Sequence, residues 1–308
     1  MDYIIGIDGG GTKTQLILCE KDNLNIIGEA ISGPSNILSS GLETTRQSFI
    51  EVFQKGVTSK GYNLEHCKAI CIGVAGGSWK SIQDQIEDII REDIGYQGKL
   101  IITNDAQTAL IAGTNGKEGI LLIAGTGSIC YGVNNEGKNI RVGGWGHIFD
   151  DKGSAYYIAI KILDSVMQAY DGRGSKTELT KLVLNYFEIE DEREIVRKIY
   201  QPNINKGEIA DIAKLIQIAY ENKDMVAMKI IDESVDELYN MVATSIRKLN
   251  FEEKFVSVII NGSVIIKNKA IREKFSNKLK QNYPKIEVKK LDKSAAYGAV
   301  IIAHNNLG

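Results

Sequence analysis

Short apolar runs separated by turns fill the first third of the chain. The runs 3–8, 15–19 and 26–30 predict three strands, and the glycine-rich turn after the first run predicts an antiparallel hairpin. The spacing of apolar residues beyond them predicts further strands and helices in alternation, namely strands over 69–75 and 99–103 and helices over 43–55, 81–92 and 105–112. This order is typical of a mixed sheet covered by helices.

A glycine-rich segment, 113–119, separates this pattern from a second one. The opening pattern then repeats, with a strand over 119–124, a glycine turn and a strand over 129–133. Any two hairpins look alike, so the pattern alone leaves duplication open. Later elements are a mostly helical stretch over 153–250, whose longest helix spans 225–249, strands over 255–260 and 286–290, and an apolar helix over 295–304.

We therefore expect two domains. Residues 1–116 form an N-terminal α/β domain, and residues 117–308 form a C-terminal α/β domain with a helical insertion. The terminal helix is free to pack back on the first domain.

Composition narrows the classes of partner. The 37 Lys and Arg against 39 Asp and Glu leave a net charge of -2, which excludes binding of nucleic acid or an anionic membrane by charge alone.

The chain lacks an apolar run of roughly 18 residues and a basic, signal-like start, so we expect a cytoplasmic protein. The four cysteines fall in predicted strands and are expected to be buried, reduced thiols.

The first hairpin turn carries the residues of a phosphate site. Glycine backbone N–H groups can wrap an anion, hydroxyl and ammonium groups add donors, and a carboxylate at the strand end can hold hydrated Mg²⁺. Asp8 is the candidate metal ligand, and the candidate phosphate contacts are Gly10, Gly11, Thr12, Lys13 and Thr14. A second turn at the corresponding place in the other half contains Gly125, Thr126, Gly127 and Ser128.

Asp105 lies where a predicted strand meets a predicted helix. It is either the N-cap of that helix or a general base facing a cleft at the carboxyl edge of the sheet, and one residue can serve both roles.

The segment 143–154 combines glycines, a tryptophan and two acids. Such glycines permit unusual backbone angles, an aromatic face suits a sugar ring, and carboxylates accept hydrogen bonds from sugar hydroxyls. The alternatives are a tryptophan that anchors the loop in the core and acids that begin the next helix. We expect His147 to stabilise this loop.

These motifs, in their order along the chain, resemble the BadF/BadG/BcrA/BcrD ATPase family. Within it they are most similar to N-acetylglucosamine kinases and bacterial N-acetylmuramic acid kinases. The matching segments are 8–14, 34–36, 75–77, 103–106, 125–128, 143–147, 151–155, 262–264 and 295–299.

The resemblance implies the actin-like, ribonuclease H-like ATPase fold, with two duplicated α/β domains around an interdomain cleft. It implies ATP and Mg²⁺ as cofactors and transfer of phosphate to the 6-hydroxyl of an N-acetylated amino sugar, in salvage of cell-wall sugars. Asp105 would be the catalytic base, Gly262 and Ser263 would join the ATP contacts, and the sugar contacts would be Asn36, Gly76, Asp105, Gly144, Trp145, Gly146 and Asp151. Kinases of this type are often homodimers.

Three alternatives remain open at this point. One is a glucosamine kinase. Another is an iron–sulfur activator ATPase of the same broad family, which needs cysteines at a subunit interface. The third is an actin-like or chaperone nucleotide switch that transfers no phosphate to a sugar. The choice between N-acetylglucosamine and N-acetylmuramic acid is also open.

Overall fold

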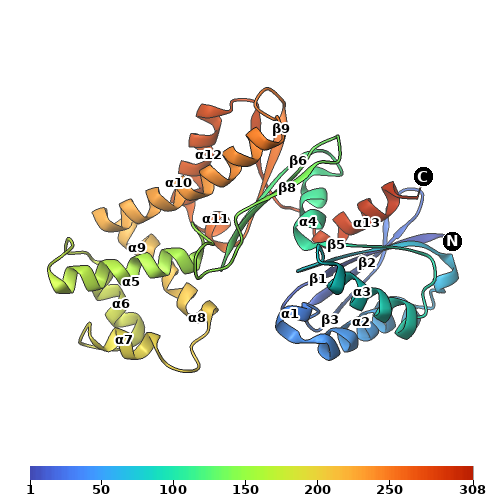
Figure 1. The fold of residues 1–308 in the computed structure, drawn as a ribbon, viewed down its shortest axis with the longest axis horizontal. Helices are drawn as coiled ribbons and strands as arrows, with labels where there is room; N and C mark the ends of the chain where they lie inside the picture. The colour runs from blue at the N-terminus through green and yellow to red at the C-terminus, as the bar shows by residue number, and fades with distance from the viewer. Residues whose placement is uncertain (308) are drawn as a thin grey trace. The chain divides into compact units, whose positions relative to one another are not determined.

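The computed structural model describes residues 1–307, which form two compact units. Unit 1 comprises Met1–Gly119 together with the chain from Leu291 onward, and unit 2 comprises Ile120–Lys290. Figure 1 labels the elements of both units. None of the helices within residues 1–307 combines the length and apolarity needed to cross a membrane.

A five-stranded sheet in the order β3-β2-β1-β4-β5 forms the centre of unit 1. The strands are β1 (Tyr3–Gly9), β2 (Thr14–Glu20), β3 (Ile26–Ser32), β4 (Cys67–Val74) and β5 (Lys99–Asn104). The first three strands are antiparallel neighbours, whereas β4 is parallel to β1 and β5 is parallel to β4. The carboxyl ends of β1, β4 and β5 therefore meet at one edge of the sheet.

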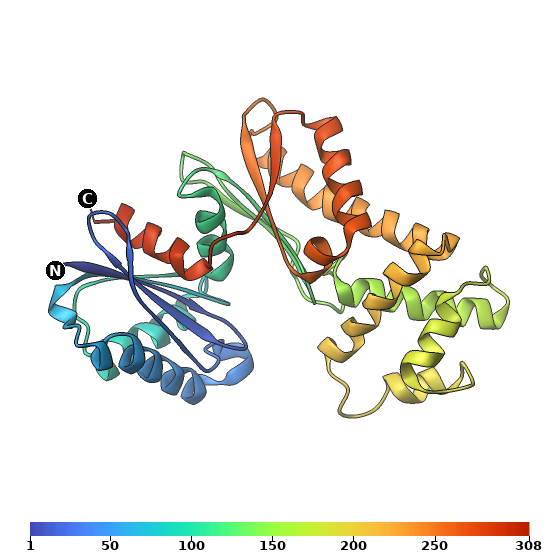
Figure 2. The same cartoon turned by 180° about the vertical axis from the view of Figure 1, so that it is seen from behind.

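Helices cover both faces of this sheet. They are α1 (Ile37–Ser40), α2 (Leu42–Gly56), α3 (Lys80–Asp88), α4 (Asp105–Thr114) and α13 (Ala295–Asn305), with short turns η1 (Thr58–Lys60), η2 (Leu64–His66) and η3 (Ile89–Asp93). Figure 2 shows α13 and α4 on the face opposite α2 and α3. Because both faces are covered, β1 is buried along nearly its whole length rather than alternating between apolar and polar residues.

Unit 2 also contains a five-stranded sheet, in the order β10-β9-β6-β7-β8. Its strands are β6 (Gly119–Ala124), β7 (Ser128–Val133), β8 (Asn139–Val142), β9 (Val256–Asn261) and β10 (Ile286–Lys290). Counted from the start of each unit, both sheets have the strand order 3-2-1-4-5. This shared order confirms the predicted duplication.

The helices of unit 2 lie mostly between its third and fourth strands. They are α5 (Ala155–Asp171), α6 (Leu179–Phe187), α7 (Glu194–Ile199), α8 (Lys206–Asp211), η4 (Ile212–Lys214), α9 (Leu215–Glu221), α10 (Met225–Lys248), α11 (Ser263–Lys267) and α12 (Lys269–Asn282). One face of α10 is buried, as its apolar spacing predicts, through Ile231, Val235, Leu238, Val242 and Ile246. α10, α5 and α12 share one apolar core with β6 and β9.

The structure corrects two details of the sequence prediction. The helix expected over 81–92 ends as α3 at Asp88 and continues as the π-helical turn η3, which brings both Ile89 and Ile90 into the core. Strand β8 was not predicted. It is a four-residue strand at the edge of the sheet with no fully buried residue, so it lacks an apolar signal.

The helices α4 and α13 cross at a glycine. A Cβ placed on Gly298 would lie 1.9 Å from the backbone oxygen of Thr108 and 2.7 Å from the backbone nitrogen of Ala112. These are backbone atoms of a helix, so they cannot move aside as a flexible side chain could.

We predict that Gly298→Ala destabilises the protein by about 1–3 kcal/mol or more, because the added methyl group forces α13 away from α4. Urea unfolding measures the change. Gly28→Ala is the control, since its Cβ would meet only ordinary contacts at 3.6 Å. Equal unfolding midpoints for the two variants would show that the crossing is not tight.

Candidate active site

The turn between β1 and β2 is held in place by backbone and hydroxyl hydrogen bonds. Gly10 N donates to Lys13 O at 3.0 Å, and Ser35 N donates to Gly10 O at 3.0 Å. Thr14 is fully buried, and its hydroxyl donates to Gly33 O at 2.7 Å. Thr12 is exposed at the tip. The hydroxyls of Thr12 and Thr14 were both expected to face phosphate, but that of Thr14 is used in a hydrogen bond inside the unit.

Two carboxylates lie at the carboxyl edge of the unit 1 sheet. Asp8 is near the end of β1, Asp105 directly follows β5, and β4 lies between these strands. Burial, and secondly the negative charge of Asp105, raise the pKa of Asp8 to about 6, while the nearby Lys13 ammonium lowers it. The two acids are therefore close enough to repel each other.

The structure assigns the N-cap of α4 to Asn104 and not to Asp105. Asn104 Oδ1 accepts from Gln107 N at 2.7 Å, which is the capping bond. Asp105 is the first helical residue, its side chain is exposed, and its Oδ1 accepts from Ala106 N at 2.9 Å. The partial positive charge of a helix N-terminus stabilises a carboxylate there.

Asn36 and Gly76 lie on neighbouring loops of unit 1. Asn36 caps the short helix α1, its Oδ1 accepting from Leu38 N at 3.0 Å. Gly76 has a φ of 78°, and a Cβ added to it would be 3.3 Å from the Leu38 side chain. The Gly76 turn is linked to the start of α4, because Asn104 Nδ2 donates to Ser78 Oγ at 3.2 Å.

The turn between β6 and β7 repeats the arrangement of the first turn. Gly125 N donates to Gly127 O at 2.9 Å, and Thr126 is exposed at the tip. Ser128 is buried, and its hydroxyl donates to Lys152 O at 2.7 Å. Thr14 and Ser128 thus occupy corresponding positions, each tying the start of a strand to a later loop.

Gly262 brings the start of α11 against this second turn. It has a φ of 97°, and a Cβ there would lie 2.4 Å from Ala124 O and 2.8 Å from Gly125 N. Only glycine fits this conformation and this space. Ser263, the first residue of α11, is exposed beside the turn.

The loop 143–150 is shaped by its glycines, as predicted. Gly143, Gly144 and Gly146 have φ values of 72°, 77° and 102°. Trp145 is 61% exposed, which excludes the alternative of a buried anchor, and the Arg141 guanidinium lies 4.3 Å from its ring centroid. Arg141 also donates to the carbonyl oxygens of Gly143 and Gly144.

The same loop is closed at its far end. Trp145 N donates to Asp150 Oδ2 at 3.0 Å, and the rings of His147 and Tyr156 meet edge to face at 4.8 Å between centroids. The next helix, α5, begins only at Ala155 with Ser154 as its cap, so the two acids do not start it.

Asp151 lies inside unit 2, only 5% exposed, with a φ of 55°. Its Oδ2 forms an ion pair with Lys206 Nζ at 2.7 Å. A Cβ on Gly127 would be 2.8 Å from the same oxygen, so the ion pair lies directly against the second glycine turn. Lys206 was not among the residues predicted from the sequence, because nothing in the local pattern of α8 marks it.

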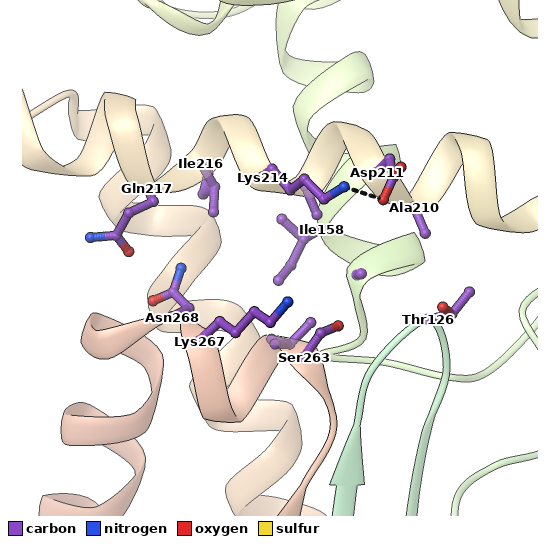
Figure 3. Close-up of a pocket in the computed structure, with 13 residues that line it drawn as sticks. Thr126, Ile158, Ala210, Asp211, Lys214, Ile216, Gln217, Ser263, Lys267 and Asn268 are labelled. Carbon is purple, nitrogen blue, oxygen red and sulfur yellow. Dashed lines mark ion pairs between the residues drawn. The ribbon is translucent and has the colours of Figure 1, made fainter.

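A cavity of about 240 Å³ opens beside the second turn, entirely within unit 2 (Figure 3). Its walls are mainly apolar but include the charged side chains of Asp211, Lys214 and Lys267, and Thr126 and Ser263 lie at one end. Sites for drug-sized ligands are typically about 300–1,000 Å³, so this cavity suits part of a ligand, such as a base with its ribose. Further lining residues are Ile158, Ala210, Ile216, Gln217, Val264 and Asn268.

The structure thus collects the predicted site residues in two groups. In unit 1 they are Asp8, Gly10, Gly11, Thr12, Lys13, Asn36, Gly76 and Asp105, around the carboxyl ends of β1, β4 and β5. In unit 2 the second turn, Asp151, Gly262 and Ser263 lie together, and the loop 143–150 leads into Asp151.

All four cysteines are free and buried, as predicted. Burial raises the pKa of Cys19, Cys67 and Cys130 to about 12, so these thiols stay protonated at neutral pH.

Comparison with known proteins agrees with the family resemblance seen in the sequence. A family model described as the BadF/BadG/BcrA/BcrD ATPase family matches residues 5–303. An N-acetylmuramic acid/N-acetylglucosamine kinase from Clostridium acetobutylicum is 39% identical over 305 residues, which cover 99% of each chain. An N-acetyl-D-glucosamine kinase from Dictyostelium discoideum is 30% identical over 318 residues, covering 99% of this chain and 98% of its own.

A solved structure shows the fold. A candidate N-acetylglucosamine kinase from Chromobacterium violaceum matches with a TM-score of 0.74 at 22% identity, covering 98% of this chain and 99% of its own. The chain has the actin-like ATPase fold that the sequence predicted.

We predict that Asp8→Asn raises stability at neutral pH. The folded state raises the pKa of Asp8 from 3.8 to about 6, so the ionised carboxylate costs up to about 3 kcal/mol above that pH. The gain should be nearly full well above pH 6 and should shrink as the pH falls from 6 toward the unfolded pKa of 3.8. It should vanish only below about pH 3, where both states hold the proton.

Urea unfolding of the wild type and the variant between pH 4 and 8 measures this difference. Asp22→Asn, at an exposed turn of unit 1, is the control. A difference independent of pH would contradict the raised pKa.

Proposed function

The chain belongs to the BadF/BadG/BcrA/BcrD ATPase family, and from that premise we propose that it transfers phosphate from ATP to the 6-hydroxyl of an N-acetylated amino sugar. The observation that carries the proposal is the position of Asp105, an exposed carboxylate at a helix N-terminus beside a second acid and a glycine turn. The relatives named as kinases of N-acetylated amino sugars, matched over nearly their whole length, support the substrate class.

Unit 2 provides the nucleotide pocket in this proposal. The base and ribose occupy the cavity between Ile158 and α11, and the phosphates extend along the turn 125–128 past Ser263. Gly262 allows the start of α11 to approach that turn, where backbone N–H groups can bind phosphate oxygens. Lys206, held by Asp151 against Gly127, adds a positive charge near the same turn.

Unit 1 provides the general base in this proposal. Asp105 accepts the proton of the sugar 6-hydroxyl while its oxygen attacks the γ-phosphorus of ATP. A new oxygen–phosphorus bond forms, the bond to the β,γ-bridging oxygen breaks, and ADP leaves with the bridging oxygen. The backbone N–H groups and exposed side chains of the turn 10–13 bind the transferred group.

The residues of unit 1 also fit a magnesium ion. Asp8 and Asp105 form an oxygen donor set whose mutual repulsion a divalent cation would relieve. Mg²⁺ commonly binds through one or two carboxylates, several waters and substrate phosphates. When bound, it neutralises charge on the phosphates; Asp8 would hold it, directly or through water.

The sugar contacts proposed from the sequence come from both units. Asn36 and Gly76 lie on the loops beside Asp105, and Trp145 offers an exposed ring flanked by Gly144 and Gly146. Asp151 is engaged with Lys206, so a direct bond to sugar requires it to share that ion pair. The cytoplasmic location and the homodimer stay predictions.

The positions of the cysteines argue against an iron–sulfur activator. Such a cluster needs accessible thiolates, whereas Cys19, Cys67, Cys71 and Cys130 are all buried in strands of the sheets.

The substrate is tested by following ADP release with N-acetylglucosamine, N-acetylmuramic acid, glucosamine and glucose. We expect turnover with one or both N-acetylated sugars and phosphate on the 6-position of the product. Preference for glucosamine or glucose would refute the substrate class, and ATP binding without any sugar phosphorylation would favour a nucleotide switch.

We predict that Asp105→Asn lowers kcat by roughly 10²–10⁴, because the amide cannot accept the proton. Binding of ADP should be unchanged, since the pocket proposed for the adenine ring lies in unit 2. Asp84→Asn on the exposed side of α3 is the matched control and should keep wild-type kcat. Wild-type turnover by Asp105→Asn would exclude this residue as the base.

A further inference from the structure

One polar atom in the unit 2 cavity lacks a partner. Gln217 Oε1 is buried, and within residues 1–307 it is the one buried side-chain nitrogen or oxygen without a hydrogen bond. Leaving such an acceptor unpaired destabilises the folded state, so its presence beside a cavity points to a ligand that donates to it.

A neighbouring acid fixes which end of the amide faces the cavity. Gln217 Nε2 donates to Glu221 Oε1 at 2.7 Å, one helical turn along α9. A carboxylate only accepts hydrogen bonds, so turning the amide over would set two oxygens against each other. Figure 3 shows the nitrogen of Gln217 directed away from the cavity and its oxygen directed toward Asn268.

Asn268 supplies a donor across from this acceptor. Its Oδ1 caps α12 by accepting from Ile271 N at 2.9 Å, which leaves the amide nitrogen as the polar group facing the cavity. Figure 3 shows that nitrogen pointing into the space below Ile216. An acceptor and a donor therefore border the same cavity, whose lining is mainly apolar with Lys214, Asp211 and Lys267 at its edge.

We propose that Gln217, oriented by Glu221, selects adenine over guanine as the base of the phosphate donor; this inference rests on the proposed kinase function. Gln217 Oε1 accepts from the exocyclic amino group of adenine, and Asn268 Nδ2 donates to the adjacent ring nitrogen. Guanine carries a carbonyl oxygen where adenine carries the amino group, so in the same pose two acceptors would face each other.

The apolar walls complete the site but do not discriminate. Ile158, Ile216 and Val264 line the cavity and can pack on the faces of either purine. Discrimination then depends on the polar edge, where a mismatched acceptor stays unpaired.

The first experiment compares ATP with GTP for the wild type and Gln217→Met, a variant of similar length without an acceptor oxygen. We expect the KM for ATP to rise about 10- to 100-fold, with kcat little changed at saturation. The ratio of kcat/KM for ATP to that for GTP should fall toward one. Unchanged nucleotide preference in Gln217→Met would overturn the proposal.

The matched control is Gln168→Met. Gln168 makes the same kind of bond, its Nε2 donating to Asp164 Oδ2 at 2.8 Å one turn away on α5, but it lies outside this cavity. We expect wild-type KM and nucleotide preference for this variant. An equal loss of preference in both variants would indicate a general effect on unit 2 and would also overturn the proposal.

A reciprocal exchange tests the role of Glu221 as a positioning residue. Gln217→Glu alone removes the amide donor and sets two carboxylates together, so nucleotide affinity should fall. Adding Glu221→Gln restores a hydrogen bond between the two side chains and keeps an acceptor facing the cavity. The double variant should recover the preference for ATP, and failure to recover it would exclude this geometry.

Direct titration of the protein with ADP and GDP separates this proposal from the proposed function. If the wild type phosphorylates no sugar, the kinase proposal fails, while the preference for ADP and its loss in Gln217→Met can still be measured. If sugar is phosphorylated but ADP and GDP bind equally well, the base-selection proposal fails alone.

Discussion

The repulsion between Asp8 and Asp105 is the interaction on which the unit 1 site depends. The parallel pairing of β1, β4 and β5 fixes where each strand ends, so both acids are placed at the same edge of the sheet. Burial and this repulsion raise the pKa of Asp8 to about 6, and Lys13 offsets only part of the effect. A fold optimised for stability alone would have no use for this pair, whereas the proposed polyphosphate and cation site would.

The backbone framework could be predicted from the sequence because its signals are local. Alternating turns and apolar runs identify nine of the ten strands found within residues 1–307, and glycine turns mark the two hairpins. Strand β8 was not predicted because a short edge strand buries few apolar residues. The turn η3 was not predicted because a π-helical turn changes the helical phase after Ile89. Of the two roles left open for Asp105, the N-cap is taken by Asn104, which is adjacent to it and of a type that caps equally well.

The site could be predicted only where its residues lie in glycine-rich motifs. Lys206 reaches Asp151 across 55 positions of sequence, and Gln217 is an ordinary polar residue in a helix until α11 and α12 form the opposite wall. Their roles arise from tertiary contacts, and no pattern along the chain marks such contacts. Thr14 and Ser128 show the converse, because their hydroxyls match a phosphate motif but are used inside each unit.

The two units share one topology but not one chemistry. Where β1 ends in Asp8 and Gly9, β6 ends in Ile123 and Ala124, so the acid at the strand end exists only in unit 1. Conversely, one wall of the cavity next to the glycine turn is built by helices inserted between the third and fourth strands of unit 2, and α11 after the fourth strand forms the opposite wall. In the corresponding place unit 1 has only α1, α2 and two short turns. Both units have a glycine turn at the corresponding place, between the first and second strands of their sheets. In the proposed function, the differences around these turns would give proton chemistry to unit 1 and nucleotide binding to unit 2.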